Sequence, residues 1–535
     1  MSVETFDFIV CGAGSAGSVL ANRLSENGRY SVAVIEGGGN DNWIWFHIPV
    51  GYLFAIGNPR SDWMFRTEPD PGLNGRSLNY PRGKVIGGCS AINAMIYMRG
   101  QAADYDGWRQ LGLAGWGWDD VLPIFRKQQD HFSGADDMHG AGGEWRVDAP
   151  RTSWELLDAF IEAAEQTGIR RTSDFNRGDN EGCGYFQVNQ KNGRRWSAAR
   201  GFLKPVLKRP NLELMTHALV DRVTFDGRRA TGVVIRKDGA TRALHARRDV
   251  ILSAGTVATP AILERSGIGA GGKLAEIGVE TIAESPGVGE NLQDHLQLRA
   301  IFKVSSVKTM NGEYRSLLRR AKMGLDYALF RRGPLTMAPS QLGAFARTSQ
   351  HFATPNVQFH IQPLSLDKFG DPLHPFDAFT ISVCNLRPES RGSIHARSRD
   401  ASDAPSIRPN YLAAMADREV AADSILLARR IAAAPALQRF KPEEYKPGAE
   451  ISSREDLMRA AGDIGTTIFH PVGTAKMGVA SDPMAVVDER LRVRGVDGLR
   501  VIDASVMPRI TSGNTNSPTM MIADKGAAMA LEDAR

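Results

Sequence analysis

The stretch FDFIVCGAGSAGSVLANRLSE, Phe6–Glu26, decides the fold, because a strand, a glycine-rich turn and a helix follow one another within it. The apolar run Phe6–Cys11 is typical of a buried parallel strand. Gly12, Gly14 and Gly17 then stand in the spacing GxGxxG, and apolar residues recur at helical spacing after them. This order predicts the first unit of a doubly wound α/β sheet that binds a dinucleotide at the turn.

Each residue of the turn has a physical use. Gly12 permits the tight turn, Gly14 lets the backbone approach a pyrophosphate, and Gly17 lets the helix pack on the strand. The helix begins beside Ser15 and Ala16, where free N–H groups and the positive end of the helix dipole face an anion. We therefore expect these residues to form the phosphate site of the cofactor.

The second strand of this unit, in the stretch YSVAVIEGG, ends on Glu36. A carboxylate here accepts hydrogen bonds from both ribose hydroxyls, which favours FAD or NAD over a cofactor with a 2′-phosphate. Three further segments are rich in glycine or alanine: Pro81–Gly100, Arg247–Gly269 and Val501–Ala530. Small residues allow close backbone approach. Several such sites along the chain suit a long cofactor, whereas NAD usually needs one crevice.

The composition is that of a folded protein with several structural units. The 535 residues are 42% hydrophobic and 23% charged, and 65 basic against 60 acidic residues give a net charge of +5. The charges are interspersed, so they do not make the clustered basic face that nucleic acid requires. Four separated cysteines without a CxxC pair predict reduced thiols and no metal site. No G-x-S-x-G, Walker or HExxH motif occurs, which argues against hydrolase and nucleotidase classes.

The location of the protein is read from two stretches. The start MSVETFDFIV lacks the basic region and cleavage site of a secretory signal. The uncharged run Asn42–Pro59 raises a membrane question, but Pro49 and Gly51 interrupt it, so a loop or lid over a ligand is favoured. We expect a cytoplasmic protein, with peripheral contact at the inner face of the membrane as the open alternative.

The segments above, taken with four later ones, resemble the glucose–methanol–choline (GMC) oxidoreductase family over nearly the whole chain. The later segments are PGVGENLQDH (Pro286–His295), LRPESRGSI (Leu386–Ile394), HPVGTAKMG (His470–Gly478) and NTNSPTMMIA (Asn514–Ala523). The chain is similar to bacterial alcohol and choline dehydrogenases of that family. The resemblance implies FAD-dependent oxidation of a primary alcohol to an aldehyde, with electrons passed to a quinone, a dye-type acceptor or oxygen. Choline dehydrogenase and alcohol oxidase are the alternatives.

The resemblance also implies roles for single residues. The catalytic base of the family falls on His470 and its partner on Asn516, with Asn514 as the less favoured alternative. The position at which some relatives attach FAD covalently falls on Ile92, so we expect non-covalent FAD. Contacts with the cofactor fall on Arg82, Gly87, Gly88, Ser90, Asn93, Ala94, Met95, Val220, Ala254, Asp503, Ala504, Pro518 and Thr519.

The chemistry agrees with the residue types. Alcohol oxidation removes a hydroxyl proton and a hydride from the same carbon, and histidine accepts protons near neutral pH. The amide of Asn516 can donate a hydrogen bond to the same oxygen without competing for the proton. Pro471 restricts His470 to extended backbone conformations. We interpret His47, His295 and His360 as packing or cofactor-shell residues.

The predicted fold is an α/β, Rossmann-like FAD-binding domain plus an α+β substrate domain with an antiparallel sheet. The cofactor segments lie far apart in the chain, so the first domain must be discontinuous: 1–160, 195–300 and 466–535. The second takes 161–194 and 301–465. Strands predicted in NVQFHIQPL, DAFTISVCNL and GSIHARS form its sheet, one face of which could roof the alcohol site.

Three questions stay open at this level. The basic amphipathic helix predicted within Tyr314–Gly333 is a solvated helix, a lid, or a docking face for a membrane quinone or anionic lipid. Choline would need an aromatic cage and a carboxylate, which the sequence does not place; a polyol or polyether is the other suggestion. A flavin carrier without activity is the rival class, against which the presence of His470 and Asn516 argues. The oligomeric state is not predicted.

Overall fold

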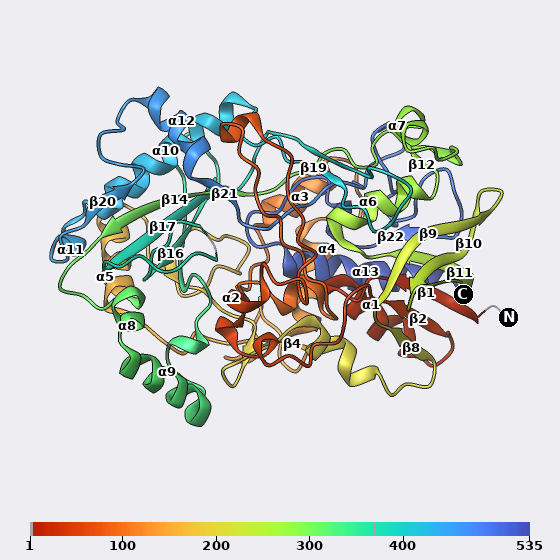
Figure 1. Cartoon of the computed structure of the whole chain (residues 1–535), viewed down its shortest axis with the longest axis horizontal. Helices are drawn as coiled ribbons and strands as arrows, with labels where there is room; N and C mark the ends of the chain where they lie inside the picture. The colour runs from red at the N-terminus through yellow and green to blue at the C-terminus, as the bar shows by residue number, and fades with distance from the viewer. Residues whose placement is uncertain (1–3, 369) are drawn as a thin grey trace.

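The computed structural model describes residues 4–368 and 370–535, and its two largest sheets lie at opposite ends of the molecule (Figure 1). The first sheet contains β1 Glu4–Cys11, β2 Val32–Ile35, β8 Leu212–Met215, β9 Ala218–Asp226, β10 Arg229–Lys237, β11 Ala240–Leu252 and β22 Leu499–Val501. The second contains β5 Gly182–Tyr185, β14 Leu296–Lys303, β15 Leu342–Ala346, β16 Val357–Gln362, β17 Ala378–Asn385, β20 Glu443–Lys446 and β21 Gly465–Thr467.

Helices cover both sheets and the region between them. They are α1 Ser15–Ser25, α2 Tyr52–Ala55, α3 Ala102–Gln110, α4 Trp118–Gln128, α5 Glu155–Gln166, α6 Gly255–Arg265, α7 Gly271–Glu276, α8 Met310–Arg315, α9 Leu317–Phe330, α10 Met415–Ala432, α11 Pro435–Gln438, α12 Arg454–Ile464 and α13 Asn516–Asp533. Four small ribbons pair β3 Gln129–His131 with β4 Trp145–Val147, β6 Gln190–Lys191 with β7 Arg194–Arg195, β12 Ile268–Gly269 with β13 Ala283–Glu284, and β18 Ser393–His395 with β19 Ser406–Arg408.

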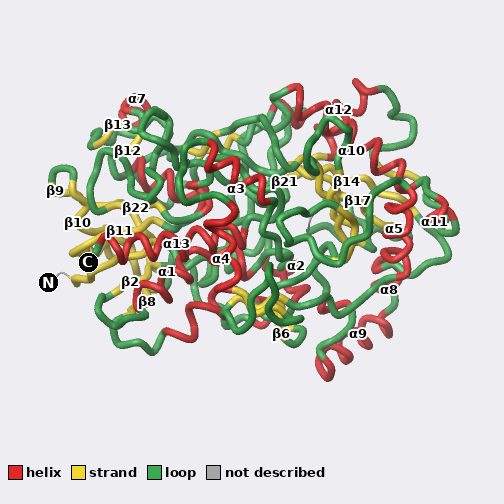
Figure 2. Tube along the Cα trace, turned by 180° about the vertical axis from the view of Figure 1, so that it is seen from behind, coloured by secondary structure: helices red, strands yellow, loops and turns green. Residues whose placement is uncertain are grey.

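The first sheet is the predicted α/β unit. Its strand order is β8-β2-β1-β11-β10-β9, with β22 beside β11. β1 pairs in parallel with β2 and β11, while β10 returns antiparallel. The helices α1 and α13, from opposite ends of the chain, pack against each other along this sheet (Figure 2). The predicted Rossmann-like fold is therefore confirmed, and the carboxyl ends of its parallel strands meet at one edge.

The second sheet is antiparallel, as predicted, in the order β20-β14-β17-β16-β15-β5 with β21 beside β14. One face of its central strands is apolar and packs in a second hydrophobic core with α5 and α10. The opposite face carries polar side chains, and these are buried as well. A polar face that does not meet solvent must meet the interior of the molecule.

Two details differ from the predicted organisation of the second domain. The segment GSIHARS does not join the antiparallel sheet: its strand β18 pairs with β19 in a separate ribbon. There His395 Nδ1 forms a hydrogen bond with Glu264 of α6, so this ribbon packs beside the first sheet. The proposed boundary at residue 160 falls inside α5, whose apolar face lies in the second core.

The uncharged run 42–59 forms short helical turns, ending in α2, instead of a long helix. Within residues 4–368 and 370–535, no helix is long and apolar enough to cross a membrane.

Candidate active site

A cavity of about 890 Å³ extends from the carboxyl edge of the first sheet to the polar face of the second. The start of α1 and the end of β2 border it at one end, and β14 and β16 border it at the other. Most predicted site residues line it: Gly12, Gly14, Ser15, Ala16, Glu36, Arg82, Gly88, Asn93, Ala94, Met95, Val220, Ala254, His470, Asp503, Ala504, Asn516 and Thr519. Gly17, Gly87, Ser90 and Pro518 lie behind this lining.

The glycine turn has the tight geometry that its sequence predicts. Gly12 has φ +111°, and a Cβ on it would lie 2.5 Å from the carbonyl oxygen of Ser253. A Cβ on Gly17 would lie 1.7 Å from the carbonyl oxygen of Gly12, so the helix could not approach the strand with any other residue there. Gly14 faces Gly88, where a Cβ would come within 2.7 Å of the Gly14 Cα. Two glycine segments thus meet at the cavity wall.

Glu36 lies at the end of β2 with both carboxylate oxygens bonded to backbone. Ala13 N–H donates to Oε2 at 3.0 Å and Gly38 N–H donates to Oε1 at 2.7 Å. Burial raises the pKa of Glu36 to about 7, although both backbone donors act to lower it. Each oxygen keeps a further lone pair for a ribose hydroxyl.

Asp503 is a second buried carboxylate in the lining of the cavity. Its Oδ2 accepts from Gly255 N–H and Thr259 Oγ1, and its Oδ1 accepts from both the N–H and the hydroxyl of Ser505. All four partners are hydroxyl or backbone groups. Asp503 therefore ties α6 to the loop before α13.

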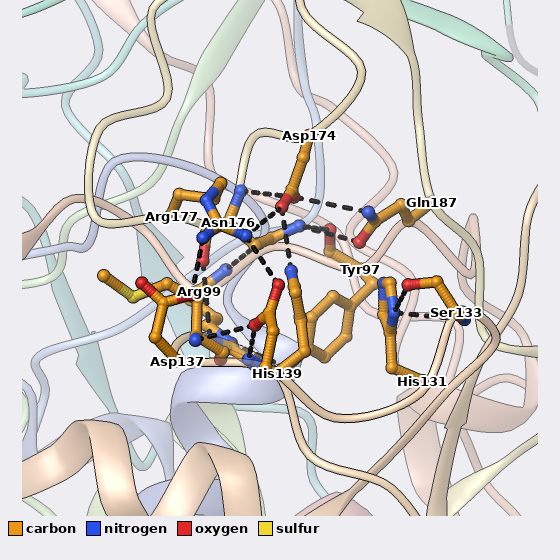
Figure 3. A network of polar contacts seen from close by, with 12 residues as sticks. Tyr97, Arg99, His131, Ser133, Asp137, His139, Asp174, Asn176, Arg177 and Gln187 are labelled. Atoms are coloured by element: carbon orange, nitrogen blue, oxygen red, sulfur yellow. Dashed lines mark hydrogen bonds and ion pairs between the residues drawn. The ribbon is translucent and has the colours of Figure 1, made fainter.

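Behind the second glycine segment lies a buried polar network (Figure 3). Arg99 donates to Tyr97 Oη at 2.9 Å and to Gln129 Oε1 at 2.8 Å. His139 bridges Gln129 and Asp174, with 2.8 Å between its Nε2 and the carboxylate. The network holds the chain that follows Met95, so it positions the cavity wall without reaching the cavity itself.

His470 takes part in a chain of hydrogen bonds that determines its tautomer. His295 Nε2 lies 3.0 Å from the carbonyl oxygen of Leu386, which can only accept, so His295 carries its proton on Nε2. Its Nδ1, 3.1 Å from His470 Nδ1, is then an acceptor, and His470 donates from Nδ1. His470 Nε2 is therefore unprotonated, and its lone pair accepts a hydrogen bond of 3.0 Å from the amide nitrogen of Asn514.

The amide of Asn514 is oriented by a further contact. Gln358 of β16 donates to Asn514 Oδ1 at 3.5 Å, which leaves the Asn514 Nδ2 group to face His470. Asn514 and His470 both line the cavity.

The structure brings Asn514, not Asn516, to His470. Asn516 is the first residue of α13, and its Oδ1 accepts a hydrogen bond of 2.6 Å from Ser15 Oγ at the start of α1. It joins the two helix N-termini at the cavity. Among the described residues, no hydrogen bond joins Asn516 to His470.

The loop that carries His470 is fixed by Asp294. His470 N–H donates to Asp294 Oδ1 at 2.8 Å, while Tyr80, Tyr411 and Thr467 donate their hydroxyls to Oδ2. The residue before His470, Phe469, has φ +69°, a conformation that costs a non-glycine residue about 1 kcal/mol or more. Such strain persists only where neighbouring contacts hold the backbone in place.

Burial holds the pKa of His470 well below its usual range, and His295, His360 and Arg82 lower it further. The imidazole is therefore neutral at pH 7 and able to accept a proton.

Sequence reasoning assigned Asp294 no role and His295 only that of a packing or cofactor-shell residue. Both lie in the quoted segment PGVGENLQDH. The only local signal was an acidic residue followed by a histidine just before a strand. Their contacts with His470 form only when the chain folds, because the residues are far apart in the sequence.

Known proteins resemble this chain along most of its length. A family model described as "GMC oxidoreductase" matches residues 6–297 with its N-terminal part and residues 388–523 with its C-terminal part. Oxygen-dependent choline dehydrogenase from Brucella anthropi is 39% identical over 97% of this chain and 94% of its own length. The protein of the same name from Burkholderia thailandensis is 40% identical over 98% of this chain and 93% of its own. The crystal structure of pyridoxine 4-oxidase from Mesorbium loti superposes with a TM-score of 0.89 at 31% identity, covering 98% of both chains.

Proposed function

This chain belongs to the GMC oxidoreductase family, FAD-dependent enzymes that act on CH–OH donors, and we propose that it oxidises a primary alcohol to an aldehyde with His470 as the general base. The observation that carries the proposal is the chain of bonds that leaves His470 Nε2 unprotonated at the cavity wall.

The residues of the cavity fit FAD. The glycine turn and the N-terminus of α1 would hold the pyrophosphate, and Glu36 would hold the adenosine ribose, because their donors and acceptors face the cavity there. Ile92 lines the cavity and offers no nucleophilic nitrogen, so we propose that the FAD is bound non-covalently. When bound, FAD supplies the hydride acceptor.

The protein's own groups carry the proton transfer. His470 Nε2 takes the hydroxyl proton of the alcohol, and its Nδ1 proton remains shared with His295. The amide nitrogen of Asn514 donates to the substrate oxygen and stabilises the negative charge that develops there. His295 is a positioning residue, since it sets the tautomer of His470 without lining the cavity. We therefore assign the partner role to Asn514, where the sequence pointed to Asn516.

Anaerobic titration of the purified holoenzyme with a panel of primary alcohols tests this proposal. An alcohol that is a substrate will bleach the flavin absorbance near 450 nm, the usual band of oxidised flavin. His470→Ala should retain the flavin and bleach far more slowly. A yellow protein that no alcohol bleaches would support the flavin-carrier alternative instead.

The similarity to oxygen-dependent choline dehydrogenases favours oxygen as electron acceptor and choline as an alternative substrate. A membrane quinone is the other acceptor consistent with the class of reaction. Reoxidation of the reduced enzyme by oxygen, compared with reoxidation by a soluble quinone, decides between oxidase and dehydrogenase activity.

We also propose that α8 and α9 touch the inner face of an anionic membrane. Apolar side chains on α9 are each more than half exposed: Leu317, Leu318, Leu325, Leu329 and Phe330. Arg320, Lys322 and Arg331 beside them form no ion pair with an acidic residue of the described chain. Exposed apolar area together with unpaired cations suits anionic lipid headgroups, at about 1 kcal/mol per basic residue. Tyr314 of α8 lines the cavity, so this surface adjoins its wall.

Vesicle sedimentation tests this contact. Binding to vesicles that contain phosphatidylserine should fall with added salt, and Leu317→Ser combined with Leu318→Ser should weaken it. Equal binding to vesicles of pure phosphatidylcholine, or none to either, would contradict the proposal.

A further inference from the structure

The polar face of the second sheet forms the far wall of the cavity. Along β14, Leu298 and Ala300 point into the apolar core, whereas Gln297 and Arg299 line the cavity. Side chains of a strand alternate between faces, so this division follows from the strand itself. The same alternation places His360 of β16 on the cavity side.

Arg299 is a buried cation without a counter-ion. Its side chain is 6% exposed, and within residues 4–368 and 370–535 no ion pair includes it. One amino group donates to Gln362 Oε1 at 3.3 Å, while its Nε has no hydrogen-bond partner among the described residues. Burial lowers the pKa of Arg299 to about 10, so the guanidinium remains charged at neutral pH.

The neighbours of Arg299 are unsatisfied as well. Ser382 lies on the central strand β17. In the register of the sheet it is opposite Arg299 of β14 on one side and opposite His360 of β16 on the other. The Ser382 hydroxyl and both ring nitrogens of His360 lack partners among the described residues. Buried polar groups are normally hydrogen-bonded, because an unpaired one costs about 1–3 kcal/mol. Several such groups on one cavity wall indicate a wall built to bind a polar ligand.

The charges of the cavity oppose a cationic substrate. Four carboxylates line it: Glu36, Asp371, Asp403 and Asp503. Glu36 and Asp503 are bonded to backbone and hydroxyl donors at the cofactor end. Asp371 and Asp403 are exposed, and each accepts a hydrogen bond within its own loop. Near β14 a trimethylammonium group would therefore meet a guanidinium, and the two buried carboxylates of the cavity, Glu36 and Asp503, are already bonded to other donors.

We propose that the substrate is an alcohol that carries a carboxylate, bound by Arg299, with its hydroxyl directed to His470. A guanidinium binds a carboxylate through two parallel hydrogen bonds and matches its single negative charge. A phosphate dianion would require a second cation. This inference rests on the proposed alcohol oxidation and adds the class of substrate to it.

The separation of Arg299 from the histidine that orients the base also bears on the length of the substrate. His295, which orients the base, directly precedes β14, and Arg299 lies four positions further along the chain, within β14. Strands rise ~3.3 Å per residue, so their Cα atoms are ~13 Å apart. We therefore expect the carboxylate and the hydroxyl to lie at different ends of the substrate, as in an ω-hydroxycarboxylate.

A substrate series with the holoenzyme tests the proposal directly. ω-Hydroxycarboxylates of increasing chain length are compared with 1-alkanols of equal length and with choline, by anaerobic flavin reduction. We expect kcat/KM for the best hydroxycarboxylate to exceed that of its matched alkanol by about 10–100-fold, the value of one charged hydrogen-bonded pair. Alkanoates without a hydroxyl should inhibit competitively.

Arg299→Met and Arg299→Lys locate the effect. Arg299→Met should bring the ratio of the two kcat/KM values close to one by raising KM for the hydroxycarboxylate, and Arg299→Lys should keep part of the preference. Arg170→Met, at an exposed arginine paired with Asp179, is the matched control and should keep the wild-type ratio. Flavin absorbance shows that each variant is folded and loaded.

The outcomes separate the two proposals. If no alcohol of any kind reduces the flavin, the proposed function fails. If neutral alcohols or choline reduce the wild-type enzyme faster than every hydroxycarboxylate, or if alkanoates do not inhibit, alcohol oxidation stands and the carboxylate assignment is wrong. The wild-type measurements decide this even if the Arg299 variants do not fold.

Discussion

His470 and Arg299 are both buried at the same cavity, yet their surroundings differ. Both ring nitrogens of His470 have a partner in His295 or Asn514, and Asp294 holds its backbone. Arg299 has one long hydrogen bond and an Nε without a partner among the described residues. A side chain whose polar atoms are all hydrogen-bonded is preorganised for a single reaction geometry. A side chain with unused donors can bind a ligand instead.

The largest effect should come from the held group. His470→Ala removes the proton acceptor, so kcat/KM for the best alcohol should fall by about 10²–10⁴-fold, measured by anaerobic stopped-flow reduction of the flavin. His351→Ala, at an exposed histidine, is the control and should react as the wild type does. Unchanged turnover in His470→Ala would end the assignment of the base.

The two asparagines sharpen the comparison further. Asn514→Ala removes the amide that faces His470 Nε2, so kcat should fall by about 10²–10³-fold. Asn516→Ala removes the contacts with Ser15 and with Met520 Sδ but none with His470, so we expect a smaller loss in kcat and weaker binding of the flavin. Flavin release by dialysis and single-turnover rates measure the two effects. The reverse order of the rate losses would restore Asn516 as the partner.

The pH profile tests how His470 is held. A base works in its deprotonated form, and burial keeps the pKa of His470 well below 6.5. The base form therefore persists as pH falls, and kcat/KM for an uncharged alcohol should stay level through pH 6.5 and decline only well below it. An acid limb centred at pH 6.5–7 would contradict this electrostatic description.

The smallest expected effect concerns a nitrogen outside the cavity. His131 in the network of Figure 3 has an Nε2 without a partner among the described residues, and burial lowers its pKa to about 4. Between pH 6.5 and 4 the unfolded chain binds this proton and the folded one does not, so stability is lost as pH falls through that window, by about 1–3 kcal/mol.

His131→Phe keeps the ring that stacks on His139 and removes the titration. The drop in melting temperature between pH 7 and pH 4.5 should therefore be smaller in the variant than in the wild type. An equal drop in melting temperature in the variant and the wild type would contradict this prediction. It would show that His131 is protonated in the folded protein as readily as in the unfolded chain.

The features that could be predicted from the sequence are those whose interacting residues lie close together in the chain. The glycine turn, Glu36 and the first sheet follow from residues that are neighbours in the chain, and there the spacing carries the geometry. The family motifs also pointed to the loop of His470. The choice between Asn514 and Asn516 was not accessible, because it depends on where α13 begins and on which side chain Ser15 meets.

The sequence by itself therefore determined the first sheet, the cofactor class and the family, since these rest on local order and on motifs that recur along the chain. Only the tertiary structure decided the hydrogen-bond partners of His470, the contact of His295 with it and the exposure of Arg299 to the cavity. The period of a strand predicts that its two faces differ, but not which face meets a core and which meets a ligand. That choice is made by packing between segments far apart in the chain, and in this protein it leaves Arg299 without a counter-ion on the wall opposite the cofactor end.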